Sequence, residues 1–187
     1  MASDAHAPAP AAAHAPTQDG MIDQKDVQDW VKRFNEGLAD SSVITAPSAP
    51  DARPWHTSFF SCFAPIDTCS TGLITCCVPC VTFGKTHHRS RKHGNMDGYN
   101  FINASCLMFT GFSCFGLHFI PMMFQRADIR KKYNLQGDCV TDLFTSCCCA
   151  CCSLVQQDKE AEHREQELAQ KLNGAGYVKP QDMAYPA

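Results

Sequence analysis

The sequence predicts a mainly α-helical fold, in which a small Cys-rich domain over residues 55–160 contains a long apolar helix and carries disordered N- and C-terminal extensions. No segment of the 187 residues shows the sustained alternation of apolar and polar residues that marks a half-buried strand. Several apolar runs are long enough to form helices. All 13 cysteines lie between Cys62 and Cys152, so the composition divides the chain into three parts.

The part before the domain is expected to form three segments. Residues 1–20 are rich in Ala and Pro and cannot build a core, so we expect a disordered tail. Residues 21–40 predict an amphipathic helix, which either docks on the domain or binds a partner or surface. Its apolar side chains recur at a spacing of three to four and are Val27, Trp30, Val31, Phe34 and Leu38. Residues 41–54 contain three Pro, which is typical of a linker.

The Cys-rich part of the chain has two basic runs on either side of an uncharged stretch. Residues 85–93 are cationic, and we expect them to form a loop that faces water or lipid headgroups. Phe101–Phe124 is uncharged over 24 residues and is the expected long apolar helix, and residues 126–132 are the second basic run. Residues 157–173 are highly charged and helix-prone, so 161–187 is expected to be a charged helix and tail.

Membrane association is expected from the apolar stretch. Phe101–Phe124 has the roughly 20 residues that a spanning helix needs, but Asn103, His118 and Pro121 make its hydropathy marginal. If it and residues 68–84 both spanned a bilayer, the two basic runs would face opposite sides, against the tendency of Lys and Arg to stay in the cytosol. We therefore expect a peripheral or re-entrant protein of the plasma membrane or an endomembrane, with cytosolic termini. A spanning protein and a cytosolic or nuclear protein remain alternatives.

Charge and motif content exclude several classes of function. The 16 basic and 19 acidic residues give a formal net charge of −3, which is too balanced for a general nucleic-acid binder. No signal-peptide pattern is visible and 13 cysteines is an odd number, so we expect reduced thiols rather than a disulfide scaffold. There is no nucleophile–base pair, phosphate loop or paired-carboxylate pattern, so we do not expect an enzyme.

Two dense cysteine clusters are the candidate metal site. Each contains the Cys-x-x-Cys spacing with which two thiolates can chelate one ion, and two such pairs together can make a tetrahedral site of four thiolates. Thiolate is a soft ligand that favours Zn²⁺, Cd²⁺ or Cu⁺ over Mg²⁺ or Ca²⁺. The candidate ligands are Cys76, Cys77, Cys80, Cys147, Cys148, Cys149, Cys151 and Cys152.

Other uses of the cysteines stay open. Neighbouring cysteines at a membrane are targets for acylation, and cysteine also packs as a small hydrophobe, which is the interpretation we favour for Cys106 and Cys114. A thioredoxin-like redox pair would need a strand–helix–strand context that the sequence does not show. His87, His88 and His93 lie among Lys and Arg, which disfavours cation binding, so we do not count them as ligands.

The motif residues of this chain resemble those of a known family. They are Trp55, Phe60, Cys62, Asp67, Cys69, the run Cys76-Cys77-Val78-Pro79-Cys80-Val81-Thr82-Phe83-Gly84, then Arg126, Arg130, Tyr133, Gly137, Asp142, the second cluster, Leu154, Gln156 and Glu160. Over residues 55–160 the chain is similar to the Cys-rich family named after the placenta-specific-eight protein. That family includes plant cadmium-resistance proteins, fruit-weight and cell-number regulators and cornifelin.

The resemblance implies a role in heavy-metal tolerance or in control of cell number, together with membrane association. We therefore expect a non-enzymatic protein that confers cadmium or zinc tolerance or homeostasis by thiolate binding, assisted export or signalling. The alternative is a regulatory or interaction protein of growth or stress response, nuclear in one version, whose clusters only staple the fold. Expected partners are Zn²⁺ or Cd²⁺, a membrane surface or lipid, a protein bound through residues 21–40 or 157–173, and a second copy of the chain. Nucleic acid is not expected.

Overall fold

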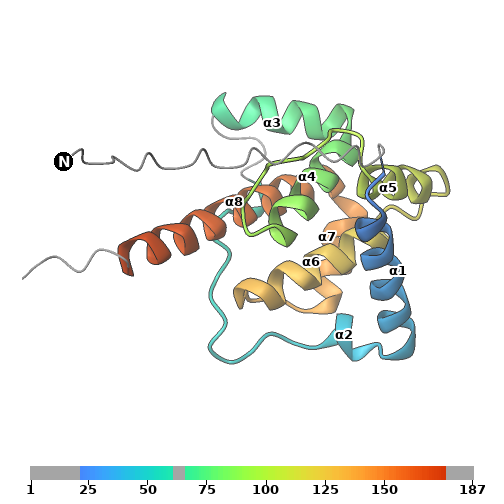
Figure 1. Ribbon diagram of the computed structural model, residues 1–187. Helices are drawn as coiled ribbons and strands as arrows, with labels where there is room; N and C mark the ends of the chain where they lie inside the picture. Colours follow the sequence, from blue (N-terminus) through green and yellow to red (C-terminus); the bar gives the residue numbers. More distant parts are fainter. Residues whose placement is uncertain (1–21, 61–65, 176–187) are drawn as a thin grey trace, which may run out of the picture.

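The computed structural model describes residues 22–60 and 66–175, and the predicted mainly helical fold is confirmed there (Figure 1). The described part has no β-strand and only one isolated bridge, between Arg53 and Leu135. Its helices are α1 (Gln24–Ala39), α2 (Ser42–Thr45), α3 (Ile66–Cys77), α4 (Pro79–Arg91), α5 (Ala104–Cys114), α6 (Phe119–Tyr133), α7 (Cys139–Cys148) and α8 (Ala150–Ala175). The predicted tail over residues 1–20 lies outside the described residues.

Side-chain caps fix where three of these helices begin. Asp23 accepts from the N–H of Lys25 at 2.8 Å at the start of α1. Asn103 and Asp138 do the same for α5 and α7, from the N–H groups of Cys106 and Thr141 at 2.8 and 2.6 Å. Each cap satisfies an N–H that has no partner within its own helix.

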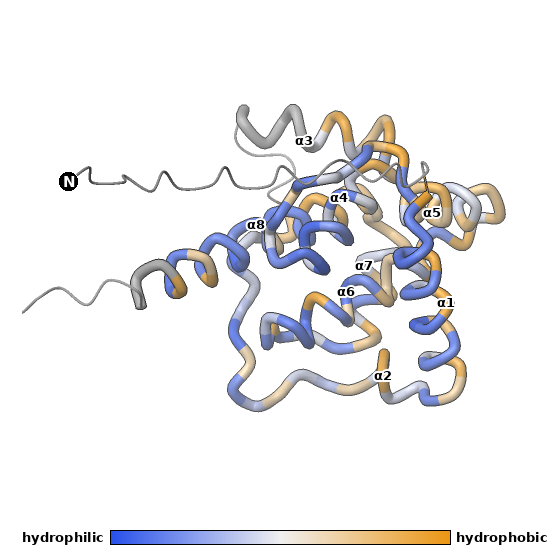
Figure 2. The backbone as a smooth tube through the Cα atoms, viewed as in Figure 1, coloured by the Kyte–Doolittle hydropathy of each residue, from blue (hydrophilic) through white to orange (hydrophobic). Residues whose placement is uncertain are grey.

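α4 and α8 pack on each other at the centre of the fold, and α3, α5 and the α6–α7 pair lie around them (Figure 1). The main apolar core lies between α1, α4, α5, α6 and α8. Its fully packed members are Trp30, Phe83, Phe109, Met122, Phe124 and Leu154. Hydrophobic residues also gather on α3 and α5, whereas much of α8 is hydrophilic (Figure 2).

The helix predicted over residues 21–40 is α1, and it docks on the domain through Trp30. The indole is only 4% exposed, and its Nε1 donates to Ser105 Oγ at 2.9 Å. It also stacks on His87 and Phe83, with ring centroids 4.7 and 5.6 Å apart. Of the two interpretations left open by the sequence, the structure therefore shows docking for this face of the helix.

The apolar stretch Phe101–Phe124 forms two helices, so the expectation of one long apolar helix is wrong. α5 ends at Cys114, Gly116 turns the chain with a φ of 72°, and α6 begins at Phe119. Pro121 gives the physical reason, because proline lacks the N–H that a helix interior requires but is tolerated in a first turn. In the described part of the chain no single helix is both long and apolar enough to cross a bilayer, and only the pair α7–α8, bent by 119°, meets that test jointly.

The cationic run 85–93 is also not the loop that we expected. Residues 85–91 form the C-terminal half of α4, which ends at Arg91. His87 and Arg89 are buried there, because His87 stacks on Trp30 of α1 and Arg89 pairs with Asp158 of α8. Basic side chains at the end of a helix also interact favourably with the helix dipole, which stabilises α4 at this point.

Two helix junctions have the same local structure. Val78 alone separates α3 from α4, and Cys149 alone separates α7 from α8. The φ and ψ angles are −137° and 68° at Val78, and −135° and 57° at Cys149. The sequences are Cys-Cys-x-Pro-Cys and Cys-Cys-x-Ala-Cys. Each junction therefore places a Cys-Cys pair at the end of one helix and a third cysteine in the first turn of the next.

Candidate functional site

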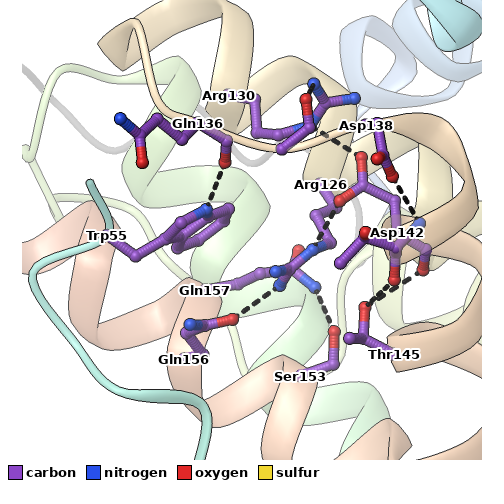
Figure 3. Close-up of polar contacts among 12 residues, drawn as sticks. Trp55, Arg126, Arg130, Gln136, Asp138, Asp142, Thr145, Ser153, Gln156 and Gln157 are labelled. Carbon is purple, nitrogen blue, oxygen red and sulfur yellow. Dashed lines mark hydrogen bonds and ion pairs between the residues drawn. The ribbon is translucent and has the colours of Figure 1, made fainter. Parts of the chain in front are cut away.

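A buried ionic cluster joins α6 to α7 (Figure 3). Nε of Arg126 and Nε of Arg130 each donate to one oxygen of Asp142, both at 2.7 Å. All three side chains are buried. Burial raises the pKa of Asp142, and the two guanidinium groups act against that rise. One carboxylate is thus shared by two arginines from successive turns of α6.

Arg126 also connects α6 to α8 and to the chain segment before α3. Its Nη1 donates to Gln156 Oε1 at 2.8 Å, and its guanidinium carbon lies 4.2 Å from the ring centre of Trp55. This is the geometry of a cation–π interaction. The indole Nε1 of Trp55 in turn donates to the carbonyl of Gln136 at 2.7 Å (Figure 3). A single guanidinium thereby contacts three separate parts of the chain.

Glu160 of α8 fixes the same segment from the other side. Its side chain is fully buried, and Oε2 accepts from the backbone N–H groups of His56 and Thr57 at 2.7 and 3.1 Å. Its other oxygen accepts from Nε of Arg164 at 2.8 Å. Gln156 Nε2 donates to the carbonyl of Thr57 at 2.9 Å. Residues 55–57 are therefore held against α8 by charge-assisted and backbone hydrogen bonds.

A second buried cluster joins α4 to α8. Asp158 Oδ1 accepts from Nη1 of Arg89 at 2.6 Å and from the hydroxyl of Thr86 at 3.2 Å, and Lys85 Nζ lies 3.2 Å from Oδ2. Since Asp158 and Arg89 are both buried, this pair is shielded from solvent. The first charged turns of α8 are in large part buried in ion pairs, which involve Asp158, Glu160, Arg164 and Glu165.

The candidate thiols lie around the two helix junctions. Cys76, Cys77, Cys147 and Cys148, at the ends of α3 and α7, are exposed. Cys80, Cys149 and Cys151 are half-buried, and Cys152 is buried. The two junctions are neighbours, because α3 packs on α8 and Cys151 Sγ lies 4.0 Å from the carbonyl oxygen of Thr75. The residue next to Thr75 is Cys76, the first cysteine of the other cluster.

The fold therefore brings the two cysteine clusters to one region, but the shared ion site stays a prediction. Among the side chains that the structure describes, no three His, Cys, Asp or Glu are gathered in a geometry that could hold an ion. The donor set itself fits a soft metal, because it consists of thiols on two neighbouring junctions.

Comparison with known proteins identifies the family. Residues 55–160 match the PLAC8 family. The chain belongs to this family. Protein PLANT CADMIUM RESISTANCE 2 of Arabidopsis thaliana is 34% identical over 128 residues, which cover 68% of this chain and 78% of that protein. Protein PLANT CADMIUM RESISTANCE 1 of the same plant is 30% identical over 132 residues, with the same coverage.

Relatives with a second kind of name are also similar. Cell number regulator 1 of Zea mays is 32% identical over 134 residues, which cover 68% of this chain and 63% of that protein. No solved structure matches the chain. The resemblance stated from the motif residues is thus confirmed at the level of the family.

In this PLAC8 domain many of the motif residues form the buried polar frame rather than a surface site. The structure brings into one network Trp55, Arg126, Arg130, Gly137, Asp142, Gln156 and Glu160. Their positions along the sequence gave no sign of this contact. The sequence also did not predict the buried ion pair between Asp158 of α8 and Arg89 of α4. One signal was available, because between Val155 and Leu168 the only apolar residue of α8 is Ala161, so the helix can bury these turns only if the charged side chains there are paired.

Two cysteines outside the clusters behave differently from each other. Cys106 is buried on α5, and its thiol contacts that of Cys80; burial raises the pKa of Cys106 to about 12. The packing interpretation is therefore confirmed for Cys106. It is wrong for Cys114, which is exposed at the end of α5.

The histidines of α4 also have distinct environments. His87 is 4% exposed, stacked on Trp30 and hydrogen-bonded to Ser105, and burial lowers its pKa to about 3. His88 is partly buried, and burial lowers its pKa as well. His87 therefore serves as a neutral packing residue of the PLAC8 domain.

Three helices of the PLAC8 domain expose apolar side chains next to the cysteines. On α3 and α7 these side chains flank the exposed Cys-Cys pairs, and on and after α5 they follow Cys106 and Cys114. They are Leu73, Ile74 and Val78; Val140, Leu143 and Phe144; and Leu107, Phe115 and Leu117. Apolar patches that a fold leaves uncovered are typical of surfaces that bind another protein or a membrane.

Proposed function

We propose that this PLAC8 protein is a non-enzymatic thiol protein that confers tolerance to cadmium or zinc by binding the ion through the two Cys-rich helix junctions. The observation that carries the proposal is the contact between the junctions, where Cys151 Sγ lies 4.0 Å from the carbonyl oxygen of Thr75. Four relatives carry the name PLANT CADMIUM RESISTANCE, which supports the same role.

The exposure of the thiols suits ion capture. The Cys-Cys pairs at the ends of α3 and α7 are open to solvent, so an incoming ion can reach them first. Cys80 and Cys151 lie in the first turns of α4 and α8, where the positive end of the helix dipole favours negative charge on a neighbouring ligand. A pair from each junction would supply the four thiolates that a tetrahedral site requires, and metal-bound thiolate is the deprotonated form.

We also propose that the protein works at a membrane surface. The exposed apolar side chains of α3, α5 and α7 offer area that a bilayer interface can cover, since each buried CH₂ contributes about 0.8 kcal/mol. Because α3 and α7 end at the Cys-Cys pairs, an apolar surface at lipid places the thiols near the membrane. The protein would then bind ions at the membrane surface or transfer them to another protein at that surface.

The decisive experiment is metal titration of the purified full chain with Cd²⁺ and Zn²⁺. The thiolate charge-transfer absorption reports binding, and growth of a cadmium-sensitive host reports tolerance. We expect C77S/C80S and C148S/C151S each to lower both, and the matched control C114S, which removes an exposed thiol outside the clusters, to leave both unchanged.

Two outcomes would redirect the proposal. If both double variants keep full metal stoichiometry and full tolerance, the cysteines serve structure or acylation, and the regulatory role suggested by the Cell number regulator relatives replaces metal binding.

Flotation with phosphatidylcholine vesicles tests the membrane surface, with L143D/F144D as the variant. A protein that stays at the bottom of the gradient regardless of these residues would reject membrane association.

A further inference from the structure

Residues from both basic runs of the sequence line one pocket. The proposed metal binding and membrane association do not involve this pocket. The pocket has a volume of about 470 Å³ and lies between α1 and the C-terminal ends of α4 and α6. Its cationic lining is Lys32, Arg33, Arg91, His93, Lys131 and Lys132. α4 supplies the end of the first basic run and α6 the end of the second, although more than thirty residues separate the two runs.

The carboxylates in this pocket do not balance its cations. Asp128 is shared by two guanidinium groups, since it pairs with Arg33 and lies 3.9 Å from Arg91. Glu36 is likewise shared, at 3.8 Å from Lys32 and 3.5 Å from Arg33. These two carboxylates therefore face three Lys and Arg side chains.

The remaining groups add to the positive charge. Lys131 is exposed and makes no ion pair with any described residue, and His93 also lines the pocket without a described acidic partner. Lys132 pairs with Glu165 and donates to the carbonyl of Ser90, so it is compensated. Asp29 is the remaining carboxylate of the lining. Five Lys or Arg side chains and the three carboxylates of Asp29, Glu36 and Asp128 give the lining a net positive charge of two. The net charge is one if Glu165, the partner of Lys132, is included.

Helix dipoles explain only part of this arrangement. Basic residues are favoured at the C-terminal ends of α4 and α6, which accounts for Arg91, Lys131 and Lys132. Lys32 and Arg33 lie in the middle of α1, where the dipole gives no such preference. Arg33 is held at 11% exposure beside Arg91, an arrangement of like charges that an anion would stabilise.

We infer that this pocket binds a phosphate-bearing anion, a phosphate monoester or diphosphate. Guanidinium groups bind phosphate through paired, charge-assisted hydrogen bonds, and a flexible lysine adds a point charge. The volume lies within the range of roughly 300–1,000 Å³ that small-molecule sites have. The same chemistry is offered by a soluble phosphate compound and by a phosphorylated lipid headgroup.

The test uses the full chain, with inorganic pyrophosphate in calorimetry and with phosphatidylcholine vesicles that contain or lack phosphatidylinositol bisphosphate. R91A/K131A should lower the affinity roughly tenfold or more, as expected for loss of charge-assisted contacts. The control K171A removes one charge from an exposed position of α8 outside this pocket and should change nothing. Binding of pyrophosphate alone identifies a soluble ligand, and binding of the phosphorylated vesicles alone identifies a headgroup.

A gain-of-affinity variant separates a site from a merely charged surface. Glu36 is 44% exposed and competes with the anion for Lys32 and Arg33, so E36Q should strengthen binding several-fold without a loss of folding. Failure of both probes to saturate, or equal weakening by K171A, would overturn the inference. Cd²⁺ titration of the same variants should be unchanged, so this result is independent of the thiol proposal.

Discussion

Arg126 of α6 and Asp142 of α7 form a buried ion pair with a distance of 2.7 Å between Nε and Oδ1. The pair is shared with Arg130 and extended to Trp55 and Gln156. Because these residues come from four parts of the chain, the pair couples α6, α7, α8 and the segment before α3 into one frame. The α7–α8 cysteine junction lies between Asp142 and Gln156 in the sequence, so this frame holds both of its helices.

Removal of the Asp142 charge should strongly destabilise the fold. D142N leaves two buried guanidinium groups with no carboxylate, which costs about 3–5 kcal/mol. The free energy of unfolding from urea denaturation measures the effect. D138N is the matched control, because Asp138 is an exposed N-cap on the same helix and asparagine caps a helix about as well as aspartate, so this variant should lose little stability. Equal losses in the two variants would contradict a role for the buried cluster.

A Cβ at Gly84 should disturb the contact between α4 and α5. The Cβ of G84A would lie 2.6 Å from Oδ1 of Asn103, the oxygen that caps α5. We expect a loss of about 1–3 kcal/mol in the free energy of unfolding, the usual cost of overpacking. G111A is the control, since no atom lies within 4 Å of its Cβ and alanine favours the helix by about 0.5–1 kcal/mol. A neutral G84A would show that Asn103 moves without cost.

Acid should weaken the fold through His87. Its folded pKa is about 3, against the usual 6.5, because burial disfavours the charged ring. Below pH 6.5 the unfolded chain takes up a proton that the folded chain refuses, so this contribution to stability is complete above pH 6.5 and is lost as the pH falls toward 3.

The check is the slope of the free energy of unfolding against pH. We expect H87Q to be less stable than the natural chain at pH 7 but to lose about 1.4 kcal/mol less per pH unit within that window. Parallel slopes for the two proteins would show that His87 does not titrate as described.

Thiol reactivity should separate the cysteines by burial. Cys106, whose pKa is raised to about 12, should resist alkylation in the folded protein. The exposed thiols Cys77, Cys114 and Cys148 should be modified first, as read by mass spectrometry after short exposure to iodoacetamide. Denaturant should abolish the difference. Early labelling of Cys106 would mean that α4 and α5 open readily.

The sequence by itself determined the helical class, the family, the amphipathic face of α1 and the spacing of the cysteine clusters. These are local properties: Trp30 falls on the apolar stripe because helical periodicity places it there, and Cys77 and Cys80 are a chelating pair by spacing alone. The motif residues identified the family by resemblance. Their order in the sequence did not predict that Trp55 and Glu160 both contact the same buried ionic network.

Only the tertiary structure decided how the charged and apolar runs are used. The uncharged stretch forms two helices because the chain turns at Gly116 and Pro121 lies in the first turn of the second helix. The basic run continues α4 because Arg89 forms an ion pair with Asp158. Likewise, the charged turns of α8 are buried because their partners come from residues 54–57, α4 and α6. Buried charge is stable only when partners arrive from elsewhere in the chain, and such long-range pairs leave no local periodicity to read.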